Sequence, residues 1–219
     1  MTEVKHLGNI LQSDNSMQKD CVTKRGKFIG KVNSFLQEFY FVAPRTFMEL
    51  LNIYGTSFYG SCLWDLYSQD VDRIYKSWNV TVRNVFNLPW TTHRYFIESV
   101  SGCAHPKTLL SSRFVKFVDS LSSSKKASVR YLASIAKGDQ RTLLGRTLEN
   151  IRNECAVDEV SLLTPRTVKE KLKYFSVPQP ECWRIKLLEE LLDARKNVCE
   201  IVDFNSDQIT TMIEDLCTT

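Results

Sequence analysis

Apolar residues recur at helical spacing through most of this chain, and this pattern restricts its fold more than any other feature. Between residues 28 and 39 they occupy positions i, i+1, i+4, i+7, i+8 and i+11, which is one face of a helix. Similar stripes follow in residues 44–60, 68–87, 106–122, 129–138, 143–151 and 165–175. Glycine and proline, which interrupt helices, number only 8 and 6 among 219 residues. The sequence therefore predicts a mainly α fold.

The helix boundaries are marked by residues that start or stop helices. Pro44 suits the first helical turn, where a missing N–H costs nothing, and Gly60 is the expected end of that helix. Ser68 is the expected N-cap of the next helix, which has two aspartates in its first turn. We also expect helices over residues 183–198 and after Asn205. Residues 4–11 alternate in part around Gly8-Asn9 and predict a short β-hairpin or the end of a sheet.

The cysteines and the apolar runs bear on compartment. Seven cysteines form no CxxC pair, and an odd count over this length favours reduced thiols in an intracellular protein. Cys103 and His105 form a Cys-x-His pair without a second pair of ligands, so an ordinary thiol and imidazole are favoured over a zinc site. No secretory signal and no membrane span is recognisable. We expect neither secretion nor membrane insertion.

Charge is unevenly distributed. Residues 101–150 hold nine basic and three acidic side chains, whereas residues 151–219 hold nine basic and thirteen acidic ones. The basic middle is consistent with an anionic partner, although such a charge run is more often a solvated helix face. Its densest part is predicted to contact phosphates. It consists of Lys125, Lys126, Arg130, Lys137, Arg141 and Arg146.

Several short segments, in matching order and spacing over residues 4–150, resemble the C-terminal part of the reverse transcriptase of non-LTR (LINE-type) retrotransposons. They are residues 4–11 (VKHLGNIL), 28–33 (FIGKVN), 59–66 (YGSCLWDL), 78–79 (WN), 87–94 (NLPWTTHR) and 113–117 (RFVKF). The resemblance implies the end of the palm in residues 1–12, thumb-like helices in 13–90 and a C-terminal helical region in 91–219. Residues 151–219 carry no motif of the family.

The resemblance also implies roles and partners. A primer-grip-like role falls on His6, Leu7 and Gly8. A surface facing the RNA or DNA template–primer would carry Lys24, Arg25, Lys27, Lys31 and Arg45. The upstream palm and fingers of the parent polymerase are the implied protein partners.

The catalytic residues of such a polymerase are missing from this sequence. Its chemistry uses two Mg²⁺ ions held by palm aspartates, including an Asp-Asp turn. The chain has no Asp-Asp dipeptide, and Asp70-Val71-Asp72 falls where acids favour the start of a helix. We therefore expect a fragment that holds no cofactor and is inactive alone, while the intact parent would be an RNA-directed DNA polymerase.

Two other interpretations stay open. The chain could be a non-catalytic helical protein-interaction module or an inert transposon remnant, because it has an acidic end and no catalytic set.

Among aromatic residues, Trp78 lies on an apolar stripe and is expected in the core, whereas Trp90 follows a proline and is the expected exposed tryptophan. His93 is expected to cap or pack rather than to act as a base.

Overall fold

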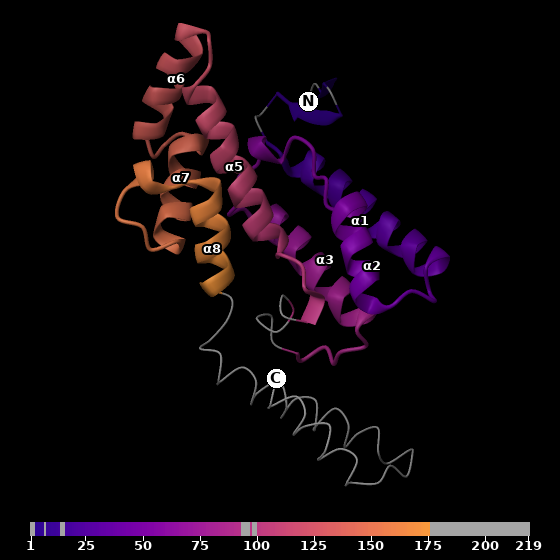
Figure 1. Cartoon of the computed structure of the whole chain (residues 1–219). Helices are drawn as coiled ribbons and strands as arrows, with labels where there is room; N and C mark the ends of the chain where they lie inside the picture. Colours follow the sequence, from indigo (N-terminus) through magenta and orange to yellow (C-terminus); the bar gives the residue numbers. More distant parts are fainter. Residues whose placement is uncertain (1–2, 7, 14–15, 93–96, 98–99, 176–219) are drawn as a thin grey trace, which may run out of the picture. The chain divides into compact units, whose positions relative to one another are not determined.

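The computed structural model describes residues 3–6, 8–13, 16–92, 97 and 100–175 (Figure 1). The chain separates into two compact units, Met1–Pro178 and Gln179–Thr219, and every described residue belongs to the first. The prediction of a mainly α chain with a short N-terminal hairpin is confirmed. The helices expected over 183–198 and after Asn205 lie outside the described residues, as do His93 and Leu7.

The hairpin consists of β1 (Glu3–His6) and β2 (Asn9–Gln12), paired antiparallel with Val4 opposite Leu11. Gly8 in the turn has a φ of 81°, a left-handed conformation that glycine adopts without a steric penalty. Every residue of β1 is exposed, whereas β2 is half-buried and contacts the first helix. The hairpin is thus attached to the helices through β2.

Among the described residues, the N-terminal half contains α1 (Gln18–Glu38), α2 (Pro44–Gly55) and α3 (Gln69–Val85). Pro44 is confirmed at the start of α2, and the Ser68 hydroxyl caps α3 by accepting a hydrogen bond from the Val71 N–H. The expected end of α2 near Gly60 is wrong, since the helix stops at Gly55. Phe58 and Gly60 have φ angles of 31° and 82°, which no right-handed helix contains.

The second half contains α5 (Pro106–Ser122), α6 (Ala127–Gly138), α7 (Leu143–Glu154) and α8 (Pro165–Phe175). Helix α5 is the common neighbour, because it contacts α3, α6, α7, α8 and the short 3-10 helix η1 (Ser61–Leu63) (Figure 1). A second 3-10 helix, η2 (Val160–Leu162), precedes α8. One buried apolar cluster extends from Cys21 to Leu172, across the predicted boundary at residue 90.

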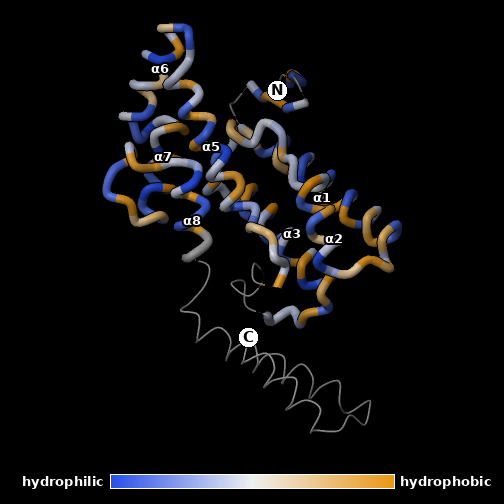
Figure 2. Tube along the Cα trace, viewed as in Figure 1, coloured by the Kyte–Doolittle hydropathy of each residue, from blue (hydrophilic) through white to orange (hydrophobic). Residues whose placement is uncertain are grey.

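Aromatic rings form the centre of the N-terminal half. Phe28 of α1 lies 5.8 Å from Phe58 and 6.2 Å from Trp78 of α3, and Phe58 lies 6.1 Å from Trp64, measured between ring centroids. Trp64 and Trp78 are fully buried, which confirms the prediction for Trp78. Trp90 is 86 % exposed, also as predicted. Figure 2 shows hydrophobic segments interleaved with hydrophilic ones along all these helices, as amphipathic packing requires.

No helix of the described part is long and apolar enough to cross a bilayer. Cys21, Cys103 and Cys155 are buried free thiols, and Cys62 is half-buried. His105 caps α5 through Nδ1, which accepts from the Lys107 N–H, and its Nε2 lies 3.2 Å from Asn79 Oδ1. Because Nδ1 accepts a hydrogen bond, the ring proton is on Nε2 and faces the Asn79 oxygen.

Candidate nucleic-acid interface

Helix α1 carries four of the cations that the sequence predicts to face nucleic acid. No acidic residue occurs between Asp20 and Glu38. The four cations do not share one surface, however. Successive residues turn by 100°, so Lys24, Lys27 and Lys31 lie on one side of the buried stripe and Arg25 lies on the other.

Lys24 links three segments of the fold. Its Nζ donates to Asn9 Oδ1 of the hairpin at 3.0 Å and to the Tyr59 carbonyl at 2.5 Å. The Asn9 side chain covers Gly60, where an added Cβ would lie 2.1 Å from Asn9 Oδ1. The side chain of Lys24 is therefore occupied by contacts within the protein, and Gly60 provides both the space and the positive φ that the arrangement needs.

Arg25 and Lys31 also contact neighbouring elements. Arg25 Nε donates to Ser77 Oγ of α3 at 2.8 Å, and Lys31 Nζ donates to the Tyr54 carbonyl near the end of α2 at 2.6 Å. Lys27 of α1 and Arg45 of α2 are exposed and make no ion pair with the described residues. Of the five cations assigned to this surface, three thus also hold the helices together.

Asp20 is a residue of this region that the sequence did not reveal as important. Its side chain is 2 % exposed, and it accepts from the Ile10 N–H at 3.1 Å and from Trp64 Nε1 at 2.8 Å. A buried indole N–H needs an acceptor, so burial of Trp64 was the available signal. Asp20 and Lys24 together attach the hairpin and the segment after α2 to α1.

The remaining solvent face of α1 carries two glycines, Gly26 and Gly30, one helical turn apart. A Cβ added at either position would meet nothing within 4 Å. Glycine in a helix interior costs about 1 kcal/mol relative to alanine, and here no neighbour in the described chain requires it. The face around Lys27 is consequently open and lets another molecule approach the helix backbone closely.

The hairpin contributes little beyond its position. His6 and Gly8 are exposed, and Leu7 lies outside the described residues. The primer-grip-like role of these three residues remains a prediction.

Asp70 and Asp72, the Asp-x-Asp of the sequence, form ion pairs along α3 with Arg73 and Lys76 at 3.1 and 2.7 Å.

The second predicted basic segment lies on other elements. Lys125 and Lys126 are exposed in the turn before α6, and Arg130 Nη1 donates back to the Ser124 and Lys125 carbonyls at 2.6 and 3.2 Å. Within the described part, Arg141 pairs with Asp139 and Arg146 with Asp65, whereas Lys137 forms no ion pair. Helix α6 packs on α5 and α7, while α1 packs on α2, α3 and β2.

A cavity of about 500 Å³ lies between α3 and α5, lined by residues that include Tyr67, Asp72, Lys76 and Lys107. Its charges already have partners, since Lys107 pairs with Glu154 and Lys76 with Asp72. The Tyr67 hydroxyl donates to Glu154 at 2.9 Å, and burial followed by the Glu154 charge raises the pKa of Tyr67 above its ordinary value. No cluster of three metal-ligating side chains occurs in the described part.

Comparison with protein-family models, with curated proteins and with solved structures finds no match for this chain. The resemblance to non-LTR reverse transcriptases therefore remains a prediction from its short sequence segments. The feature that bears on function is the solvent face of α1. It carries Gly26, Gly30 and Lys27 and has no acidic residue beside them on the helix.

Proposed function

We propose that this chain is a non-catalytic part of an RNA-directed DNA polymerase of the non-LTR retrotransposon type, and that it binds template–primer nucleic acid through α1. The segments of family resemblance support the class. The observation that carries the binding proposal is the solvent face of α1, where Lys27 lies beside Gly26 and Gly30 without an acidic neighbour on the helix.

A duplex is the partner that suits this face. A lysine neutralises backbone phosphate and reads no base, so Lys27 supplies affinity and not sequence specificity. The glycines let a sugar–phosphate backbone or groove edge come within van der Waals distance of the helix, which side chains would prevent. In this proposal Arg45 and the hairpin residues His6, Leu7 and Gly8 border the same nucleic acid, and the palm and fingers of the parent supply the Mg²⁺ chemistry.

The test compares Gly26→Ala and Gly30→Ala in the full 219-residue chain, with an RNA–DNA hybrid duplex as the probe. Both alanines should stabilise α1, by about 0.5–1 kcal/mol each, because they remove backbone freedom from the unfolded chain. Each should nevertheless weaken duplex binding about tenfold if the duplex backbone contacts this face, equivalent to about 1.4 kcal/mol. Gly138→Ala, at the end of α6 and also open, is the matched control.

Lys27→Gln supplies a second readout. The dependence of log K on log salt should become shallower by about 0.7–0.9, the value for one phosphate contact. Duplex binding that tolerates both glycine variants and keeps its salt slope in Lys27→Gln would contradict the assignment to α1. The chain alone should incorporate no nucleotide with Mg²⁺, and incorporation would contradict the non-catalytic class.

A further inference from the structure

Ser128 follows a pair of adjacent cations, Lys125 and Lys126, in an arrangement that occurs once in this sequence. Adjacent lysine or arginine residues are found at 24–25, at 195–196 and here, and only here does a serine or threonine stand two residues after the pair. Two positive charges therefore precede the Ser128 hydroxyl by two and three residues.

All three side chains are open to solvent. Lys125, Lys126 and Ser128 are exposed. Within the described part neither lysine forms an ion pair, and the Ser128 hydroxyl makes no hydrogen bond. Ser134 of the same helix is also exposed, but its hydroxyl donates to a backbone carbonyl of α6 at 2.7 Å and no cation stands two or three residues before it. Ser128 is thus the exposed, unbonded hydroxyl of α6 that positive charge precedes.

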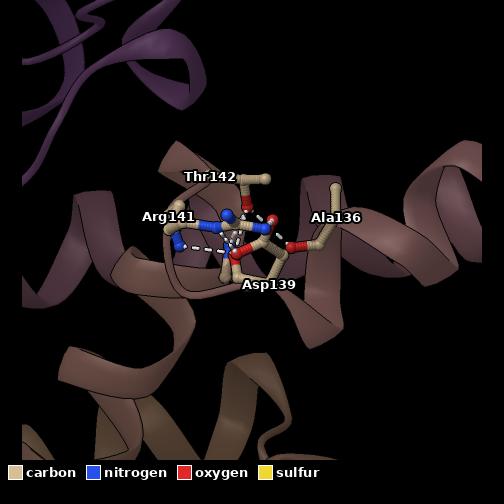
Figure 3. Close-up of polar contacts among 5 residues, drawn as sticks. Ala136, Asp139, Arg141 and Thr142 are labelled. Carbon is tan, nitrogen blue, oxygen red and sulfur yellow. Dashed lines mark hydrogen bonds and ion pairs between the residues drawn. The ribbon is translucent and has the colours of Figure 1, made fainter.

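The C-terminal end of α6 is held by the corner between α6 and α7 (Figure 3). Thr142 Oγ1 lies 2.7 Å from the Ala136 carbonyl oxygen and 2.8 Å from the Asp139 carbonyl oxygen. The same oxygen accepts from the Gly145 N–H at 3.0 Å. Arg141 donates two hydrogen bonds of 3.1 Å to the Asp139 carboxylate. This end of the helix is therefore fixed to α7.

The N-terminal end of α6 has no comparable support. Lys126, the N-cap, provides no side-chain cap, and the buried residue of the helix, Ala133, lies beyond its first turn. Arg130 donates to two backbone carbonyls of the preceding turn at 2.6 and 3.2 Å, but both hydrogen bonds are exposed and water can replace them. The first turn can therefore open without uncovering the core and present Ser128 to an enzyme in extended form.

The charge around Ser128 indicates which enzyme and which modification fit. Residues 120–138 hold four basic side chains and no acidic one. A kinase whose substrate groove is lined with carboxylates selects such a segment and rejects acidic ones. The helix macrodipole favours negative charge at the N-terminal end of α6 and disfavours Lys125 and Lys126 there. A phosphate on Ser128 brings a charge of about −1.5 to −2 to this place, beside the first N–H groups of a helix that no side chain caps.

We propose that Ser128 is a phosphorylation site for a serine kinase that selects basic residues. A bond forms between Ser128 Oγ and the γ-phosphorus of ATP, while the bond from that phosphorus to the bridging oxygen breaks and ADP leaves with its electron pair. The hydroxyl proton passes to a carboxylate of the kinase. The phosphate then faces Lys125 and Lys126 and caps α6. This site is independent of the α1 face of the proposed function, and each can fail without the other.

The experiment treats the full 219-residue chain with Mg²⁺-ATP and the catalytic subunit of cyclic-AMP-dependent protein kinase, which selects basic residues at these two positions. Mass spectrometry should find one phosphoryl group per chain, on Ser128. Ser128→Ala should abolish its incorporation, and Lys125→Ala with Lys126→Ala should lower kcat/KM by about tenfold. Ser134→Ala, at the exposed serine without preceding cations, is the matched control and should leave kcat/KM unchanged.

A synthetic peptide of residues 121–134 tests access to the hydroxyl in the folded chain. Modification of the peptide but not of the full chain would overturn the proposal, because folding would then conceal Ser128. Incorporation at other residues, or an unchanged kcat/KM in the double lysine variant, would overturn it as well. Circular dichroism checks that each variant keeps its helices.

Amide hydrogen exchange tests the effect on the helix. Phosphorylation should slow exchange in residues 129–132 by about threefold, because the phosphate stabilises the first turn of α6. Exchange in α7, beyond the corner, should not change and is the internal control. An unchanged rate in residues 129–132 would overturn the contact between the phosphate and this end of the helix.

Discussion

Helices α1 and α6 are both flanked by basic residues, but their cations make different contacts. On α1, Lys24 contacts Tyr59, Arg25 contacts Ser77 and Lys31 contacts Tyr54, at sequence separations of 35, 52 and 23 residues. At α6, Arg130 contacts only carbonyls five and six residues away, and Lys125 and Lys126 are exposed. Basic residues of the first kind stabilise the fold, whereas those of the second kind are available to a partner.

A count of basic residues does not distinguish those that stabilise the fold from those that are available to bind a partner. Substituting a cation on α1 changes stability together with any binding, so a loss of binding there is ambiguous. Lys125 and Lys126 near α6 are exposed, so substituting either should leave the fold intact and report on binding alone. Lys27 is the exception on α1, because it is exposed and bridges to no described element.

The largest expected effect tests whether the α1 region is held by its buried contacts. Asp20→Ala should lower the free energy of unfolding by about 3 kcal/mol, since it leaves the Ile10 and Trp64 donors buried without an acceptor. Denaturant unfolding measures this. Asp119→Ala, an exposed aspartate of α5, is the control and should change stability by less than about 0.5 kcal/mol. If Asp20→Ala lowered the free energy of unfolding no more than Asp119→Ala, the contacts of Asp20 would contribute nothing to stability.

Two glycine-to-alanine variants give the next effect, and they should change the free energy of unfolding in opposite directions in the two regions. Gly145→Ala at the α6–α7 corner would place a Cβ 2.3 Å from the Asp139 carbonyl oxygen, and the resulting shift should cost about 2 kcal/mol. Gly30→Ala on α1 meets open space and should gain about 0.7 kcal/mol. Thermal unfolding of both variants measures the contrast. A stabilised Gly145→Ala would show that the corner does not fix α6.

The helices were predictable where their signals are local. Pro44 and Ser68 start helices through their own chemistry, and the apolar stripes define the buried faces, so these elements follow from neighbouring residues. The end of α2 was not predictable in this way. Gly60 takes its conformation beneath Asn9, a residue 51 positions earlier, and no local pattern encodes that contact.

The same reason limits prediction of the candidate site. The apolar stripe predicts the buried face of α1, but it does not predict the partners of Lys24, Arg25 and Lys31, because these depend on which segments pack there. Asp20 escaped prediction because an acid near a helix start normally reads as an exposed first-turn residue. Its role depends on burial of Trp64, which is set by the whole core.

Alkaline pH should weaken the α1 region through its buried thiol. Burial, with a smaller contribution from the Asp20 charge, raises the pKa of Cys21 from 9.0 to about 12. The folded chain therefore keeps a proton that the unfolded chain loses above pH 9. The stability linked to this thiol is complete below pH 9 and is lost as the pH rises toward 12, by about 1.4 kcal/mol per pH unit at most.

The measurement is the free energy of unfolding at pH 8, 9 and 10. Burial likewise raises the pKa of Cys62 and Cys103, and that of Cys155 to about 11, so four thiols contribute to the fall. Cys21→Ala should be less stable than the natural chain at pH 8 but should show a flatter pH profile. An unchanged profile would mean that the Cys21 thiol is accessible enough to ionise in the folded state.

The smallest effect bears most directly on the comparison of the two regions. Lys24→Met should cost about 1 kcal/mol, because Asn9 and the Tyr59 carbonyl lose a charged donor. Lys126→Met should change stability by less than about 0.5 kcal/mol, because its ammonium group makes no ion pair with the described residues. The free energy of unfolding is measured for both variants. If Lys126→Met destabilised the fold as much as Lys24→Met, the cations near α6 would stabilise the fold as those of α1 do.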